Sequence, residues 1–332
     1  MKSLKRITAL AATAVVAVST AACHVGAGGD VSGTPNNVQF IVDTGPGGGS
    51  DLFARQTIKI ARDNGVLNEN WPVIAKPEGG GLGAMAFLKS KPRNSNFISA
   101  FTSKWVIAGQ AAKTSAVQLG DLTPVVMLAD EVQVIAAPVD APFNTMTEFI
   151  EAAKRDPGQL VQTGGSPNSV DNLVALQIEK SVGVKWKYLS FDDGASRITA
   201  MLRGDAQIDI GAVPDFADQV DAGKLKLIGV FADQRLPDYP DVPTIAEQQI
   251  DLGDFPSHLQ FRGIAGPPQM SQTAVDYYLD FFRKVAETDA WKEYLRTEGL
   301  VPTFVTGAEL KAQIDEFSKA TKPLVESMVN HS

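Results

Sequence analysis

Cysteine, histidine and long hydrophobic segments are scarce in this chain of 332 residues, and each shortage argues against a class of function. Cys23 is the only cysteine, so no disulfide can form within the chain. The histidines are His24, His258 and His331, too few for a zinc site built from a His/Cys cluster. The apolar run near the start is too short to span a bilayer, and no further segment has the pattern of a transmembrane helix.

Signatures of catalysis and nucleotide binding are missing as well. A Ser-His-Asp triad would depend on His258, because no serine stands in a Gly-x-Ser-x-Gly elbow. No glycine run is followed by the Gly-Lys-Ser/Thr of a Walker A loop, and none has dinucleotide-binding spacing. We therefore expect no enzymatic activity, no bound metal and no cofactor. A secreted hydrolase that uses His258 is the alternative left open.

The charge balance excludes another class of partner. The chain has 30 Lys and Arg against 38 Asp and Glu, a net charge of −8, with the two signs interspersed. We expect no nucleic-acid partner, since such proteins present basic patches. An anionic small molecule remains possible because local dipoles decide binding at a site.

The N-terminal residues have the pattern of a secretory signal peptide. Lys2, Lys5 and Arg6 precede an apolar run over residues 7–18, and small residues then lead to Cys23. We expect residues 1–22 to be the signal peptide and Cys23 to be lipidated, as in a bacterial lipoprotein. Ordinary cleavage near Ala22, which would leave a free cysteine, is the alternative. Residues 23–37 are rich in Gly, Ser, Pro and Asn, which favours a flexible tether.

The folded part is organised around residues 45–51, Gly-Pro-Gly-Gly-Gly-Ser-Asp. An apolar strand pattern over residues 38–42 precedes them, and a helical pattern over residues 52–62 follows. Free backbone N–H groups in such a strand-to-helix turn attract a carboxylate, phosphate or sulfate. A tight connection that needs glycine for steric reasons alone is the other interpretation.

Two more strand–helix units follow this loop. Residues 72–75 and 97–101 have strand patterns, and the glycine run 79–81 leads to a helical pattern over 82–88. Three such units in a row predict a mostly parallel sheet with ligand groups at the carboxyl ends of its strands. Thr102 and Ser103 stand at one of these ends.

The middle of the chain predicts a second unit of the same kind. The apolar stretch 122–137 suits a strand that crosses between domains, and residues 225–230 suit the return crossing. Residues 161–163 form a strand pattern before Gly-Gly-Ser-Pro-Asn-Ser at 164–169, and a helix is expected over 170–181. We expect a second anion cradle here. In a further predicted helix ending at Leu202, we expect Ile198, Met201 and Leu202 to face inward.

Several motifs in a fixed order resemble those of a known family. After the loop at 45–51 come Pro-Glu-Gly-Gly-Gly at 77–81, Phe-Asp-Asp-Gly at 191–194 and Leu-Arg-Gly-Asp at 202–205. Val-Pro-Thr-x-x-Glu at 242–247 and Arg-Gly-x-x-x-Pro-Pro at 262–268 follow. The chain resembles the solute-binding proteins of the tripartite tricarboxylate transporters, the TctC or Bug family.

The resemblance implies an α/β, two-lobed type II periplasmic-binding-protein fold with a hinge of crossing strands and a ligand between the lobes. It places lobe 1 at residues 38–128 and 232–332 and lobe 2 at 129–231. It also implies a monomer outside the cytoplasmic membrane that delivers a small organic carboxylate to integral-membrane transporter subunits. A ligand-sensing partner of a membrane kinase, with the same fold, remains the alternative.

The resemblance further implies which residues bind the ligand. They come from both lobes and are Gly47, Gly48, Gly49, Ser50, Asp51, Thr102, Ser103, Ser166, Asn168, Ser169, Asp171, Phe191, Asp192 and Val213. Relatives often have lysine or glycine where Asp192 stands. Asp192 would repel a second ligand carboxylate unless Arg197 or Lys104 offsets its charge.

Overall fold

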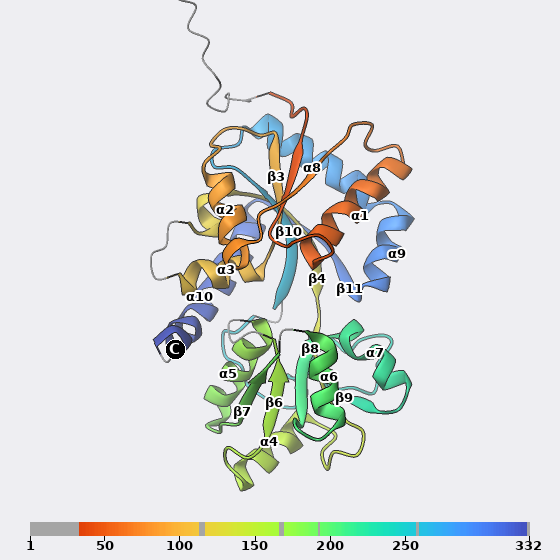
Figure 1. Cartoon of the computed structure of the whole chain (residues 1–332), viewed down its shortest axis with the longest axis vertical. Coiled ribbons are helices and arrows are strands. Elements are labelled where there is room, and N and C mark those ends of the chain that lie inside the picture. Colours follow the sequence, from red (N-terminus) through yellow and green to blue (C-terminus); the bar gives the residue numbers. More distant parts are fainter. Residues whose placement is uncertain (1–32, 113–116, 166–168, 192, 257–258, 331–332) are drawn as a thin grey trace, which may run out of the picture.

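The computed structural model describes residues 33–112, 117–165, 169–191, 193–256 and 259–330. The described elements form two α/β lobes, each built around one sheet, which lie one above the other in Figure 1. The predictions for the signal peptide, Cys23, Ser166, Asn168, Asp192 and His258 lie outside the described residues.

The first lobe contains a six-stranded sheet in the order β11-β4-β10-β3-β1-β2. Its strands are β1 (Gln39–Val42), β2 (Val73–Ala75), β3 (Phe97–Thr102), β4 (Thr123–Glu131), β10 (Gln260–Gly266) and β11 (Leu300–Thr306). Its helices are α1 (Gly49–Asp63), α2 (Leu82–Lys89), α3 (Ser103–Ala111), α8 (Gln272–Ala286), α9 (Asp289–Thr297) and α10 (Gly307–Asn330). Two short 3₁₀ turns, η1 (Glu78–Gly81) and η2 (Leu119–Asp121), complete it.

The apolar strands of this sheet are buried on both faces because helices cover each side. Successive side chains of a strand point to opposite faces. In β1, Phe40 and Val42 pack in the same cluster as Phe53 of α1, whereas Ile41 packs with Trp105 of α3 on the other face. A continuous apolar strand is therefore explained by a layer of helices on either side of the sheet.

The first sheet is mixed, which corrects the prediction of a mostly parallel sheet. The strands of the three strand–helix units do pair in parallel, β1 with β2 and β1 with β3. By contrast, β10 is antiparallel to β3 and β4, and β11 is antiparallel to β4. The reason is that β4 runs toward the second lobe, and β10 returns from it in the opposite direction.

The second lobe contains a five-stranded sheet in the order β7-β6-β8-β5-β9. Its strands are β5 (Gln133–Pro138), β6 (Val161–Gly164), β7 (Lys187–Ser190), β8 (Ile208–Ala212) and β9 (Leu225–Phe231). Its helices are α4 (Met146–Arg155), α5 (Val170–Val182), α6 (Gly194–Leu202) and α7 (Val213–Asp221). In α6, Leu202 is 43% exposed, so its predicted inward position is wrong, and Ala200 and Met201 are buried instead.

The predicted crossing over residues 122–137 is confirmed as two consecutive strands, β4 in the first sheet and β5 in the second. The prediction that residues 225–230 form the return crossing is wrong, because β9 pairs with β5 within the second sheet. The chain re-enters the first sheet only at β10.

The connection from β9 to β10 packs in part against the second lobe. Thr244 forms a β-bridge with Val230 of β9, and Gln177 Nε2 of α5 donates to the carbonyl of Leu252 at 2.7 Å. The sequence had assigned this connection to the first lobe. Its polar backbone groups instead find partners on the helices and the edge strand of the second sheet.

Candidate functional site

The loop between β1 and α1 has the strand–turn–helix geometry that its glycines predict. Gly47 has a φ of +82°, a conformation that glycine adopts without steric cost. A Cβ on Gly48 would lie 2.5 Å from the Cβ of Thr44, so no larger residue fits without displacing Thr44. Helix α1 begins at Gly49, three residues before the predicted start, with Gly48 as its N-cap.

The carboxylate of Asp51 is occupied by contacts within this loop. Its Oδ2 accepts the backbone N–H of Gly47 at 3.0 Å, and Arg55 Nε donates to both of its oxygens at 2.9 Å. The hydrogen bond from Arg55 is the main cause that holds the pKa of Asp51 below its usual value. Thr44 Oγ1 accepts the N–H of Asp51 at 3.1 Å. Asp51 therefore fixes the shape of the loop and takes up the N–H of Gly47.

Two donors of the loop remain available to a ligand. The N–H groups of Gly49 and Ser50 have no partner among the described residues. They open a helix of 15 residues, whose N-terminus carries partial positive charge. Arg262 lies beside them, with its Nη1 3.7 Å from the position of a Cβ on Gly49.

The carboxyl ends of β2 and β3 lie beside this loop. Trp105 Nε1 of α3 donates to Oδ2 of the buried Asp43, which follows β1, at 3.0 Å. A Cβ on Gly81 of the second glycine run would lie 2.5 Å from the same indole. Ser103 is fully buried, and its hydroxyl has no partner in the described part of the chain. Thr102 pairs in register with Arg262.

The second lobe has a loop with the same internal bonding. Asp171 near the start of α5 accepts the N–H of Gly165 through Oδ2 at 2.8 Å, as Asp51 accepts that of Gly47. The hydroxyl of Tyr188 donates to the same oxygen at 2.7 Å. Ser169 is the N-cap of α5, and its hydroxyl lies 3.3 Å from that of Tyr188.

Arg197 of α6 is engaged inside the second lobe. Its Nε and Nη2 donate to the two carboxylate oxygens of the fully buried Asp209, at 3.0 and 2.6 Å. Burial raises the pKa of Asp209 to about 7, and the arginine opposes this shift. The guanidinium of Arg197 is therefore held by the buried Asp209 within the second lobe.

The other two residues predicted at the far end of the ligand are partly exposed. Phe191 follows β7, and its N–H donates to the carbonyl of Gly164 at 2.9 Å. Val213 is the first residue of α7. Both stand at carboxyl ends of strands in the second sheet, where parallel α/β sheets place their ligands.

A cavity of about 450 Å³ joins the two lobes. Its walls come from the second glycine run, one face of α3 and the first turn of α5, and its lining residues are Gly79, Gly80, Leu82, Lys104, Ile107, Ala108, Ala111, Ala112, Ser169, Val170 and Gln260. Of the predicted ligand residues, Ser169 lines it. Lys104 is exposed and has no hydrogen-bond or ion-pair partner among the described residues.

The sequence prediction missed a charged pair at the hinge. Arg262 of β10 donates through Nη2 to Oε2 of Glu131, the last residue of β4. Gln260 Nε2 donates to the other carboxylate oxygen at 2.8 Å. A charged residue within the apolar pattern of β10 was the signal that could have drawn attention to Arg262, since buried charges are normally paired.

A comparison with models of protein families matches residues 72–329, more than half of the chain, to TctC, the tripartite tricarboxylate transporter family receptor. The chain belongs to the TctC family. This confirms the resemblance inferred from its motifs. The matched residues include the second-lobe loop and the hinge pair, whereas the loop at 45–51 precedes them.

Individual relatives of this TctC-family chain are distant but cover nearly all of it. The "UPF0065 protein in gbd 5'region" of Cupriavidus necator is 24% identical over 295 residues, 88% of this chain and 87% of that protein. The crystal structure of a TctC solute binding protein from Polaromonas is similar, with a TM-score of 0.74 and 21% identity over 89% of this chain and 98% of that one.

Two similar structures contain ligands. A protein from R. palustris with adipate has a TM-score of 0.68 and 17% identity, covering 89% of this chain and 97% of that one. MatC from Rhodopseudomonas palustris with bound malate has a TM-score of 0.62 and 18% identity, covering 88% and 98%. At these identities the likeness shows the two-lobed fold.

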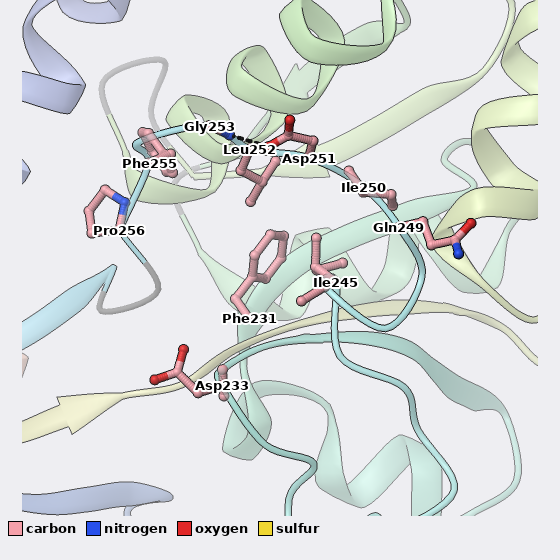
Figure 2. Close-up of a pocket in the computed structure, with 12 residues that line it drawn as sticks. Phe231, Asp233, Ile245, Gln249, Ile250, Asp251, Leu252, Gly253, Phe255 and Pro256 are labelled. Carbon is pink, nitrogen blue, oxygen red and sulfur yellow. Dashed lines mark hydrogen bonds between the residues drawn. The ribbon is translucent and has the colours of Figure 1, made fainter.

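The TctC-family chain has another pocket, of about 410 Å³, in the connection from β9 to β10. Figure 2 shows Phe231, Ile245 and Leu252 directed toward one another at its centre. Asp251 accepts the N–H of Gly253 at 2.8 Å at its edge. None of the predicted ligand residues that the structure describes lines this pocket.

The described part of the chain lacks both a membrane-spanning helix and a cluster of metal ligands. No helix there is long and apolar enough to cross a membrane. No group of three or more His, Cys, Asp or Glu side chains there is arranged to hold a metal ion.

Proposed function

We propose that this TctC-family protein captures a small organic carboxylate between its two lobes and delivers it to the membrane subunits of a tripartite tricarboxylate transporter. The observation that carries the proposal is the cavity of about 450 Å³ with walls from both lobes. A ligand in such a cavity holds the lobes together, which a membrane partner can recognise as the loaded state.

The chemistry around the cavity favours an anion. Lys104 and Ser169, in the first turn of α5, line the cavity, and both can stabilise a carboxylate. The free N–H groups of Gly49 and Ser50 and the guanidinium of Arg262 lie outside this lining and are of the same kind. The apolar wall formed by Leu82, Ile107 and the alanines of α3 suits a hydrocarbon body. The structural neighbours with adipate and malate support a small carboxylate as the ligand class.

We propose further that the ligand residues include the loop glycines, Thr102, Ser103 and Ser169, with Asp51 and Asp171 acting through the loops that they hold in shape. Gly47, whose N–H is bound by Asp51, would then contribute its backbone conformation rather than a donor. Phe191 and Val213 would line the far end. Ser166, Asn168 and Asp192, which lie outside the described residues, belong to the same proposed set of ligand residues. A crystal structure with the bound solute tests this assignment residue by residue.

The cellular setting is part of the same proposal. We propose that residues 1–22 direct export, that Cys23 is lipidated and that the protein acts as a monomer tethered outside the cytoplasmic membrane. Mass spectrometry of the purified N-terminus tests the anchor, because a lipidated cysteine is heavier than a free one by the mass of its acyl chains. An unmodified N-terminus at residue 23 would overturn the anchor alone.

Titration calorimetry against mono-, di-, tri- and aromatic carboxylates tests the ligand class. We expect saturable binding of at least one of them, and no binding of any would overturn it. Uptake into vesicles that contain the two membrane subunits tests the partner. Uptake that is the same with and without this protein would favour the role of a sensor partner.

A further inference from the structure

Arg262 lies at the hinge, beside the first-lobe loop. It is the third residue of β10, and its guanidinium lies beside Gly49 and 6.0 Å from the ring centroid of Phe53. Gln260, two residues earlier and therefore on the same face of the strand, lines the cavity. The side chain of Arg262 is 20% exposed, so part of it is open to a solute bound at the loop.

The hydrogen-bonding capacity of this guanidinium is only partly used. Nη2 donates to Glu131, whereas Nε is buried without a partner and Nη1 has none within the described ranges. A guanidinium has five N–H donors and forms its strongest hydrogen bonds with carboxylates. The unused donors lie on the group that borders the free N–H groups of Gly49 and Ser50.

Glu131 holds Arg262 in position but accepts from only one of the nitrogens of its guanidinium. Its carboxylate is 10% exposed and is shared between Arg262 and Gln260. It is also the last residue of β4, directly before the chain crosses to the second lobe. A second carboxylate at Nη1 would therefore complete the donors of Arg262 while the pair with Glu131 keeps the arginine in place.

We propose that Arg262 is a ligand-binding residue that makes the site selective for anionic carboxylates over neutral analogues of the same shape. The ligand carboxylate would accept from the N–H groups of Gly49 and Ser50 and from Nη1 of Arg262. Glu131 pairs with Nη2, and its negative charge repels the ligand carboxylate at Nη1 and so limits the affinity. This inference rests on the proposed carboxylate-binding function and adds to it the residue that reads the ligand's charge.

Calorimetry with one bound carboxylate and its primary amide tests this role. We expect R262M to weaken carboxylate binding about tenfold or more, the strength of a charge-assisted hydrogen bond, and to leave amide binding unchanged. R262K keeps the positive charge but loses the planar guanidinium with its paired donors, so we expect a smaller loss of carboxylate affinity. E131Q removes the repelling charge and strengthens carboxylate binding. R235M, which breaks the exposed pair of Arg235 with Glu247, is the matched control and leaves both affinities unchanged.

The outcomes separate this inference from the proposed function. If R262M binds the carboxylate as the unaltered protein does, Arg262 does not read the charge, although the proposed function stands. If the unaltered protein binds no carboxylate, both are overturned. Thermal melting identifies a folding defect in R262M, and the double variant R262M/E131Q, which leaves no unpaired charge at the hinge, then replaces it in the comparison.

Discussion

Gly299 of the first lobe lies directly against Pro214 of the second. A Cβ on Gly299 would be 2.6 Å from both Cγ and Cδ of the proline ring, well inside van der Waals contact. Gly299 joins α9 to β11, and Pro214 is the second residue of α7. The two lobes therefore touch here, and the absence of a side chain on Gly299 permits the contact.

We expect G299A to act as a wedge between the lobes. The added methyl group separates Gly299 from Pro214, so the lobes close less completely and the affinity for the carboxylate falls about fivefold or more. Titration calorimetry measures the affinity, and small-angle X-ray scattering of the ligand-bound protein measures a larger radius of gyration.

The variant G307A provides a matched control for this wedge. Gly307 has a φ of +60°, close to the +62° of Gly299, but a Cβ on it would meet no atom within 4 Å. Both substitutions therefore strain the backbone and lower the melting temperature to a similar degree. Equal affinities of G299A and G307A would mean that the contact with Pro214 does not limit closure.

Gly48 is a position in the first loop that has no room for a side chain. In G48A the new methyl group overlaps Thr44, whose hydroxyl accepts the N–H of Asp51, so the loop that presents Gly49 and Ser50 must shift. We expect a loss of about 1–3 kcal/mol in unfolding free energy and at least a tenfold loss of carboxylate affinity. G45A is the control, because a Cβ there meets nothing within 4 Å. Chemical denaturation and calorimetry measure the two effects, and equal behaviour of both variants would contradict this account.

Lys104 supplies a cation to the cavity between the lobes. If a ligand has a second carboxylate, the ammonium group of Lys104 attracts that carboxylate across solvent. K104M should therefore weaken dicarboxylate binding by about two- to fivefold. A monocarboxylate of the same chain length should bind K104M and the unaltered protein equally. K311M, on an exposed lysine of α10, is the control. A parallel loss for mono- and dicarboxylates would show that Lys104 acts through the shape of the cavity.

The buried pair of Asp209 and Arg197 gives a pH dependence of stability with a defined sign. Burial raises the pKa of Asp209 from 3.8 to about 7, so the folded protein binds more protons than the unfolded chain between these values. The contribution of Asp209 to the free energy of unfolding therefore falls as the pH rises from about 4 to 7 and is constant above it.

Comparison with D209N isolates this contribution. The unfolding free energy of the unaltered protein minus that of D209N should decrease from pH 5 to pH 8, by on the order of 1 kcal/mol or more. Carboxylates with lowered pKa values, such as Asp51, are present in both proteins and cancel in the difference. Urea denaturation at several pH values measures it. A difference that increases with pH would mean that the pair with Arg197 outweighs burial.

The local elements of this fold could be predicted because their causes are local. The alternation through Phe40, Ile41 and Val42 follows from the two faces of a strand, and the glycines of residues 45–49 mark the turn into α1. Thr145 caps α4 by accepting the N–H of Glu148, three residues away. These relationships depend on neighbours within about one helical turn, which a sequence displays directly.

For the candidate ligand residues, the sequence indicated where they stand in the chain but not which groups they contact. Asp51 and Asp171 do stand at the two loops, but Oδ2 of each accepts a backbone N–H of its own loop. Tyr188, 17 residues after Asp171, is the partner that the sequence did not indicate. A carboxylate near glycines has the same local pattern whether it contacts a ligand or supports the loop, so the pattern alone left its role open.

The sequence by itself determined the strand–helix units, the two glycine-rich loops and the family. Only the tertiary structure decided the mixed strand order and the pair of Glu131 with Arg262, which are 131 residues apart. It also decided the bond from Trp105 to Asp43, across 62 residues. The physical reason is that a buried charge or indole N–H takes whichever partner the packed sheets bring within about 3 Å, and that distance is set by the whole fold. The loop at 45–51 was visible in the sequence, and the arginine beside it was not.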